Sequence, residues 1–300
     1  MIKTRPGTGP APDTGTDGDT DVHMDVHMDD DGLAGGAADA SATAPEGPLP
    51  GDPNIMTSLV RGLAVIQAFS RDTPSMTISQ ISQTTAIPRA AVRRCLYTLK
   101  ALGFADTQDG RRWVLRPRIL ALGHAYLGSI PLTRVAQPLL RRISERLNES
   151  CSMAILDGDD IVYIARASVS RIMTIDLHVG SRLPAAFTSM GRVLLAARPD
   201  ELDARLARVA FTPFTPHTVR DAAALRAEIA KVRAAGYCIV DQELELGLRS
   251  IAVPILASDG TAYAALNIGA HASRISAAEM VETILPLLRE AAAELSLCVG

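Results

Sequence analysis

Arginines gather in one short stretch of this sequence at the spacing of a helix that contacts DNA. Arg89 and Arg93 are four residues apart, which places them on one helix face, and small alanines between them would allow a close approach. A guanidinium can donate two hydrogen bonds to guanine O6 and N7, and a helix in the major groove presents such side chains from its first turns. The predicted DNA contacts on this helix are Arg89, Ala90, Ala91, Arg93, Arg94 and Tyr97.

A second pair of arginines follows the turn Gln108-Asp109-Gly110. Asp-Gly tolerates positive φ, so the turn predicts a β-hairpin with strands at 104–106 and 113–115. Arg111 and Arg112 would lie on this wing and contact phosphates or the minor groove. The alternative for all these arginines is that they are solvated side chains lying over the protein surface.

Three helices must precede the hairpin and position these arginines. Spacings of three and four residues between apolar side chains predict a helix that begins at Ser58, its N-cap. Thr77 is predicted to cap a second helix, and Pro88 suits the first turn of a third. Side chains expected to face the interior include Leu59, Leu63 and Leu102. Three helices and a hairpin over residues 55–117 are typical of a winged helix-turn-helix.

The distribution of charge supports this interpretation. Residues 55–118 carry 10 basic and 3 acidic side chains and therefore +7, whereas residues 119–300 carry 18 basic and 19 acidic and therefore −1. A basic block beside a neutral bulk is the expected footprint of a nucleic-acid-binding module, here one for a double-stranded DNA operator. Charge alone fits a solvated basic face equally well.

Residues 1–54 differ sharply in composition. They carry 2 basic and 11 acidic side chains, a net charge of −9, and few large apolar residues. Such a segment cannot offset the entropy of ordering, so we predict a disordered acidic tail. Its Val-His-Met-Asp repeat at 22–29 could hold a metal weakly, but a solvated tail is the preferred interpretation. One hypothesis is that translation starts at Met56 in the native host.

Several function classes are disfavoured. No apolar run approaches the roughly 20 residues of a membrane helix, and no secretory signal is recognisable. The four cysteines are far apart, which favours buried thiols in a reducing cytoplasm over a metal site or disulfides. GxSxG, HExxH and GxGxxG motifs are missing from the sequence, so neither catalysis nor a cofactor is expected.

The remainder of the chain alternates helices and strands. A linker helix is predicted within 118–131 and an α+β sensor domain over 132–300. Strands are expected at 152–156, 161–165, 237–240, 250–256 and 263–268, and helices at 132–147, 190–197, 200–209, 221–235 and 276–297.

From about residue 55 to 296 the sequence resembles the IclR-type transcriptional regulators. The opening helix at 58–66 and the third helix at 87–96 carry the resemblance in the first domain. Within the family it is most similar to the β-ketoadipate-pathway group, which regulates protocatechuate and 4-hydroxybenzoate catabolism. The segments that point to this group are 149–152, Leu183-Pro184-Ala185, 188–195 and 243–254.

The resemblance implies a GAF-like effector-binding domain, and dimers that pair into tetramers. By matching motifs it places the effector site at Ser189, Met190, Asp241, Leu248, Ser250, Asn267 and Gly269. Many members of the family carry small hydroxyl residues where Asn267 and Gly269 stand here, so the polar pattern of the site is changed.

The resemblance implies that the effector is a small carboxylated molecule, an aromatic acid or a β-keto acid, and chemistry gives an independent reason to expect an anion site. The first turn after Ser189 offers unpaired N–H groups to an anion. A carboxylate also favours an arginine, and the candidates are Arg249 and Arg171. The preferred alternative for each arginine is a surface salt bridge, and Ser189 and Asp241 could equally be an N-cap and a turn residue.

The main hypothesis is a ligand-responsive regulator of aromatic-acid catabolism. The first alternative is a constitutive DNA-binding protein whose second domain only oligomerises. The second alternative is a metabolite-binding protein with no role on DNA.

Overall fold

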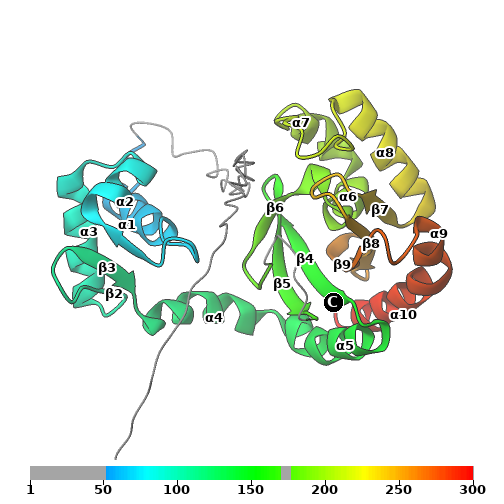
Figure 1. Ribbon diagram of the computed structural model, residues 1–300, viewed down its shortest axis with the longest axis horizontal. Coiled ribbons are helices and arrows are strands. Elements are labelled where there is room, and N and C mark those ends of the chain that lie inside the picture. The colour runs from blue at the N-terminus through cyan, green and yellow to red at the C-terminus, as the bar shows by residue number, and fades with distance from the viewer. Residues whose placement is uncertain (1–51, 170–176, 300) are drawn as a thin grey trace, which may run out of the picture. The chain divides into compact units, whose positions relative to one another are not determined.

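The computed structural model describes residues 52–169 and 177–299 (Figure 1). The tail predicted for residues 1–54, with its His-Asp repeat, falls almost wholly outside these ranges, and so does Arg171. The positions of the N-terminal and C-terminal parts of the chain relative to one another are not determined, so each is described by itself.

The N-terminal part is a winged helix-turn-helix. Its helices are α1 (Thr57–Gln67), α2 (Ile78–Thr85) and α3 (Arg89–Ala101), and its strands are β1 (Ser75–Thr77), β2 (Ala105–Asp106) and β3 (Arg112–Leu115). The strands form an antiparallel sheet in the order β1-β3-β2. The side chains that close its core include Val65, Ile81, Val92, Leu96 and Trp113.

Local signals set the helix ends in this domain. The Thr77 hydroxyl accepts the N–H of Gln80, and the Gln80 side chain accepts the N–H of Thr77, which confirms the predicted cap as a reciprocal capping box. Ala86 ends α2 with a left-handed φ of 55°, and Gly103 follows α3 with a φ of 78°. The turn between α2 and α3 therefore directs α3 away from the axis of α2.

Three details of the prediction are wrong here. Ser58 lies inside α1, which has Met56 as N-cap without a side-chain hydrogen bond. Leu59, Leu63 and Leu102 were expected inside but are 57%, 48% and 52% exposed. Leu102 is the C-cap of α3, where the chain turns out of the helix. The short strand β1 was not predicted, because its pairing with β3 is not visible in local sequence.

Helix α4 (Leu120–Ser129) follows a 3-10 turn at Pro117–Ile119 and links the two parts along the chain. Helix α5 (Pro131–Leu147) begins at Pro131, whose missing N–H costs nothing in a first turn. The predicted linker helix is thus confirmed, with its end at Ser129. Along 52–169 and 177–299, no helix combines the length and apolarity needed to cross a membrane.

The C-terminal part is built on an antiparallel sheet in the order β6-β5-β4-β9-β8-β7. Its strands are β4 (Ser150–Asp157), β5 (Asp160–Ala167), β6 (Arg182–Pro184), β7 (Cys238–Asp241), β8 (Leu248–Leu256) and β9 (Ala262–His271). Strand β6 was missed because it is three residues long. The predicted α+β class is confirmed.

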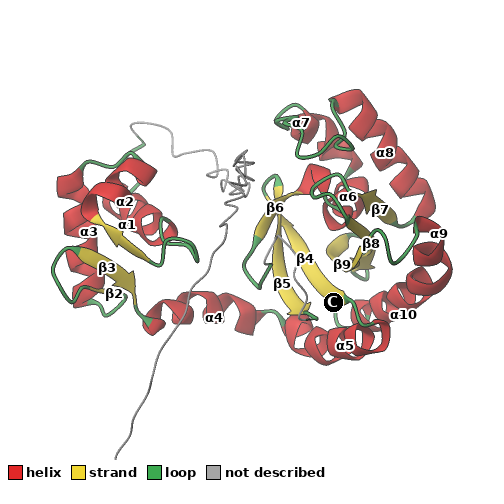
Figure 2. Ribbon diagram, viewed as in Figure 1, coloured by secondary structure: helices red, strands yellow, loops and turns green. Residues whose placement is uncertain are grey.

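Helices cover both faces of this sheet (Figures 1 and 2). Helices α5 and α10 (Leu285–Ser296) pack on one face. Helices α6 (Ser189–Ala196) and α8 (Ala222–Ala235) pack on the other face. That second face also carries helix α7 (Leu202–Leu206) and the 3-10 turns Ala185–Phe187 and Pro199–Glu201. The last helix was predicted as one element. It starts as α9 (Ala277–Glu279), passes through a π-helical turn at Met280–Ile284 and continues as α10.

Side chains alternate between the two faces along β4, and a register shift in its pairing with β5 between Met153 and Ala154 leaves Ile164 as an extra residue, so that Tyr163 and Ala165 face opposite sides. Cys151, Met153 and Ala165 belong to the core under α5 and α10, whereas Ala154 and Tyr163 belong to the core under α6. Polar residues at the α6-side positions therefore face the space beside α6.

Candidate functional site

Helix α3 presents its arginines on the face opposite its core residues. Val92, Leu96 and Leu99 are buried, whereas Arg89, Arg93 and Arg94 are exposed. The Arg93 guanidinium lies over the Tyr97 ring, 5.5 Å from its centroid, and this cation–π contact orients the side chain. Ala90 is exposed and Ala91 half-buried, so no large side chain obstructs this face.

The wing carries the second pair of arginines. The Asp109 carboxylate accepts the backbone N–H groups of Arg112 and Arg111, each at 2.8 Å, and these bonds lower its pKa below the ordinary value. Arg112 also donates to the Ser75 carbonyl on β1 at 3.4 Å. Trp113 of β3 is 2% exposed and anchors the wing to the core.

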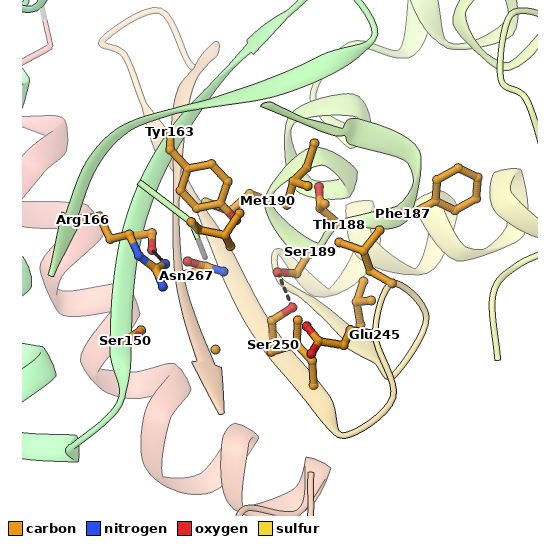
Figure 3. Close-up of a pocket in the computed structure, with 17 residues that line it drawn as sticks. Ser150, Tyr163, Arg166, Phe187, Thr188, Ser189, Met190, Glu245, Ser250 and Asn267 are labelled. Atoms are coloured by element: carbon orange, nitrogen blue, oxygen red, sulfur yellow. Dashed lines mark hydrogen bonds between the residues drawn. The ribbon is translucent and has the colours of Figure 1, made fainter. Parts of the chain in front are cut away.

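A cavity lies between the α6 side of the large sheet and the chain around α6. It measures about 690 Å³, including the part open to solvent. Figure 3 shows the side chains that line it. Its polar wall contains Ser150, Ser152, Arg166, Thr188, Ser189, Glu245, Ser250 and Asn267, and the remaining wall is formed by Tyr163, Leu177, Leu183, Phe187, Met190, Val240, Leu244, Leu248 and Gly269.

Most of the effector positions expected from sequence meet in this cavity. Ser189 and Met190 come from the start of α6, Leu248 and Ser250 from β8, and Asn267 and Gly269 from β9. The Ser250 hydroxyl donates to the Ser189 hydroxyl at 2.9 Å (Figure 3).

The start of α6 is tightly fixed. Thr188, not Ser189, is the N-cap, and its hydroxyl accepts the N–H of Gly191 at 3.0 Å. A Cβ atom at Gly191 would lie 2.1 Å from the Ala185 carbonyl oxygen, so only glycine fits there. One of the N–H groups predicted to receive an anion is therefore already used.

Asp241 and Arg249 are placed differently from the expectation, and neither lines the cavity. They are partners across β7 and β8, where the Arg249 guanidinium binds the Asp241 carboxylate at 2.8 Å. Arg249 also donates to the carbonyls of Ala272 and Ile275. The pairing of β7 with β8 therefore places the Arg249 guanidinium, which was expected to bind the ligand, in an ion pair with Asp241.

Arg166 is the cavity arginine that sequence reasoning missed. It lies on β5, and its guanidinium donates to the Ser152 hydroxyl on β4 at 2.7 Å. Burial lowers the pKa of Arg166 below its ordinary value. The available signal was a charged residue directly after the apolar run Ile161–Ala165 of a predicted strand.

A buried ion pair fixes the loop between β7 and β8 beside the cavity. Arg192 of α6 is 1% exposed and binds both carboxylate oxygens of Glu243, at 2.7 and 2.6 Å. Glu243 also accepts the N–H of Val219, while Thr215 and Thr218 donate to backbone carbonyls of the loop. This loop supplies Leu244 and Glu245 to the cavity wall.

Two family models match the chain. Residues 58–109 match the IclR helix-turn-helix domain, and residues 124–297 match the C-terminal domain of bacterial transcriptional regulators of the IclR type.

Characterised relatives and a solved structure agree with these matches. The chain is 55% identical over 247 residues to the Pca regulon regulatory protein of Pseudomonas putida, covering 82% of this chain and 84% of that protein. It is 35% identical to the p-hydroxybenzoate hydroxylase transcriptional activator of Acinetobacter baylyi, covering 80% and 90%. An IclR homologue from Microbacterium hydrocarbonoxydans, solved in complex with 4-hydroxybenzoate, has a TM-score of 0.71 at 28% identity, covering 81% of this chain and 98% of that one.

Proposed function

The chain belongs to the IclR family of bacterial transcriptional regulators, and we propose that it switches genes of aromatic-acid catabolism in response to a small carboxylated effector. It is a ligand-responsive DNA-binding regulator, which is supported by its helix-turn-helix match, by its similarity to a Pca regulon regulatory protein and by the IclR homologue solved with 4-hydroxybenzoate. The observation that carries the effector class is a cavity in the effector-binding domain with an arginine in its wall.

For DNA we propose that α3 enters the major groove with Arg89 and Arg93 toward base edges. Among the described residues neither guanidinium forms an ion pair with a carboxylate, so both keep their donors for a partner. Arg94 and Tyr97 would contact the flanking backbone, and Arg111 and Arg112 would reach it from the wing.

We further propose that the protein acts as a homodimer or a pair of dimers. Support comes from apolar side chains that the single chain leaves in solvent. Helix α1 exposes Leu59, Val60 and Leu63, and α4 exposes Leu120 and Tyr126. Faces of this kind are commonly covered by a partner, and a second copy is the partner a symmetric operator requires.

The proposed mechanism is a population shift. An effector that fills the cavity favours one arrangement of the β7–β8 loop and α6, and α4 passes the change along the chain to the DNA-binding part. Family membership favours a role without catalysis, and conversion of an effector by the purified protein would contradict it.

The experiment is a titration with protocatechuate, 4-hydroxybenzoate and β-ketoadipate. The thermal midpoint and the affinity for operator DNA would be followed together. An effector at 100 times its dissociation constant adds about 2.7 kcal/mol to the stability of the folded state. A rise in midpoint with a change in operator affinity identifies the effector. If none of the three acids changes the affinity for operator DNA or the thermal midpoint, the result would favour a constitutive DNA-binding protein.

A further inference from the structure

We propose that Arg166, Ser152 and Asn267 form the subsite that holds the effector carboxylate. This inference rests on the proposed function, because it assumes that the cavity binds an acid. It assigns the anion to the sheet and not to the start of α6 or to Arg249.

The three side chains form one row across the sheet. Ser152 of β4 pairs directly with Arg166 of β5 on one side and with Asn267 of β9 on the other. Directly paired residues of neighbouring strands project to the same face, so this register places a guanidinium, a hydroxyl and an amide side by side. Figure 3 shows Arg166 and Asn267 pointing toward the same part of the cavity.

The row contains hydrogen-bonding capacity that the protein itself does not use. The Nε atom of Arg166 and the Oδ1 atom of Asn267 are buried and have no hydrogen-bond partner among the residues that the structure describes. Buried polar groups are almost always paired, since an unmet donor or acceptor is costly. Two such atoms in one row of a cavity wall point to a missing ligand.

The chemistry of the row selects a carboxylate. In residues 52–169 and 177–299, no carboxylate forms an ion pair with Arg166, whereas Arg192 binds Glu243 and Arg249 binds Asp241. A ligand carboxylate could accept from the free Nε and a neighbouring Nη of the guanidinium together, the strongest geometry for this pair. The Asn267 amide can rotate to donate its NH2 group to the same carboxylate.

The rest of the cavity fits the body of such an acid. Tyr163, Phe187 and Met190 add apolar and aromatic surface to the cavity wall. At the far side, Ser189 and Ser250 are already bonded to each other, and the cap of α6 uses the Gly191 N–H. An aromatic ring would therefore lie against the apolar wall with its carboxylate directed to Arg166.

The test compares an acid with its neutral amide in wild type and in Arg166→Met. Isothermal titration calorimetry would measure 4-hydroxybenzoate against 4-hydroxybenzamide, and protocatechuate against its amide. Wild type should prefer each acid about ten- to hundredfold, the range expected for hydrogen bonds to a charged group. Arg166→Met should lose that preference while the affinity for the amides changes little. The matched control is Arg182→Met, since Arg182 binds Asp157 and Asp160 outside the cavity and its loss should leave the preference intact.

A second variant keeps the test decisive if Arg166→Met does not fold. Asn267→Asp retains the size of the side chain and adds a negative charge to the row, so it should select the amide over the acid. The unliganded Arg166→Met protein should melt no lower than wild type, because the fold loses a half-buried charge that no carboxylate of the described residues neutralises.

The outcomes separate this inference from the proposed function. If wild type prefers the acids and both Arg166→Met and Asn267→Asp retain that preference, the subsite is wrong and the effector class stands. If wild type binds neither acid above its amide, both the effector class and the subsite are overturned.

Discussion

Removal of Glu243 should destabilise the effector-binding domain more than any other single carboxylate change on the α6 side of the sheet. Its carboxylate holds both terminal nitrogens of Arg192, and the Arg192 side chain is only 1% exposed. In Glu243→Leu the guanidinium keeps its Nε bond to the Ala186 carbonyl but loses the one carboxylate that pairs with it in the described part of the chain. Breaking a buried pair in this way costs about 3–5 kcal/mol.

Replacing Arg192 should lower the stability of the domain less than replacing Glu243 does, and replacing both residues should lower it least. In Arg192→Met the orphaned Glu243 side chain, 13% exposed in the native protein, can recover water. In the double variant Arg192→Met/Glu243→Leu no charge is left buried, and two apolar side chains occupy the space. We therefore expect a coupling energy of at least about 2 kcal/mol between the two positions.

Urea unfolding followed by two probes would measure these values. Trp113 is the only tryptophan of the chain and lies in the core of the DNA-binding domain, so its fluorescence reports that domain alone. Far-UV circular dichroism reports the unfolding of both domains. A transition that appears in circular dichroism but not in tryptophan fluorescence therefore belongs to the effector-binding domain. The fluorescence transition should not move in any variant. A loss below about 1 kcal/mol in Glu243→Leu, or additive losses in the double variant, would refute the reasoning.

Three further results are expected. Arg89→Ala should weaken operator binding about 5- to 150-fold in a gel shift, the range for one bidentate base contact, whereas Arg142→Ala on α5 should leave it unchanged; equal loss in both would remove α3 from the interface. Gly191→Ala should lower the thermal midpoint by about 2–12 °C, which corresponds to an overpacking cost of about 1–3 kcal/mol, because the added methyl meets a backbone carbonyl oxygen; an unchanged midpoint would show that α6 can shift. Burial raises the pKa of the Cys151 and Cys238 thiols to about 12, so at pH 8 the folded state keeps them as neutral thiols and they should react with a thiol reagent only after unfolding; rapid reaction in the native protein would contradict their burial.

Local patterns in the sequence predicted the DNA-binding part well. The spacing that placed Arg89 and Arg93 on one face of a helix also placed Val92 and Leu96 on the other, and the structure has both. The Asp-Gly turn predicted the hairpin, and the Asp109 side chain holds it through two backbone N–H groups. These features depend on residues close in sequence, which is why a pattern could find them.

Features that depend on pairing between distant strands could not be predicted in this way. Strand β1 exists because it pairs with β3, some 37 residues away, as the bond from Arg112 to Ser75 illustrates. The same limit misplaced Arg249, because the register that brings it to Asp241 is a property of the folded sheet. Family motifs located the cavity through Ser189 and Asn267, but they did not point to Arg166.

Three arginines of the effector-binding domain show how the partner of a side chain decides its role. Arg192 and Arg249 each have a carboxylate within 2.8 Å and further carbonyl acceptors, so a ligand carboxylate would have to displace an existing ion pair, and neither arginine lines the cavity. The Arg249 Nε is buried without an acceptor, as the Arg166 Nε is, but the Arg249 guanidinium is already neutralised by Asp241. Arg166 lines the cavity, has a neutral hydroxyl at 2.7 Å and forms no ion pair with a carboxylate among the described residues, so a ligand carboxylate would add a bond without breaking an ion pair. Because Arg166 is the one of the three that both lines the cavity and lacks a carboxylate partner there, we assign the effector carboxylate to Arg166.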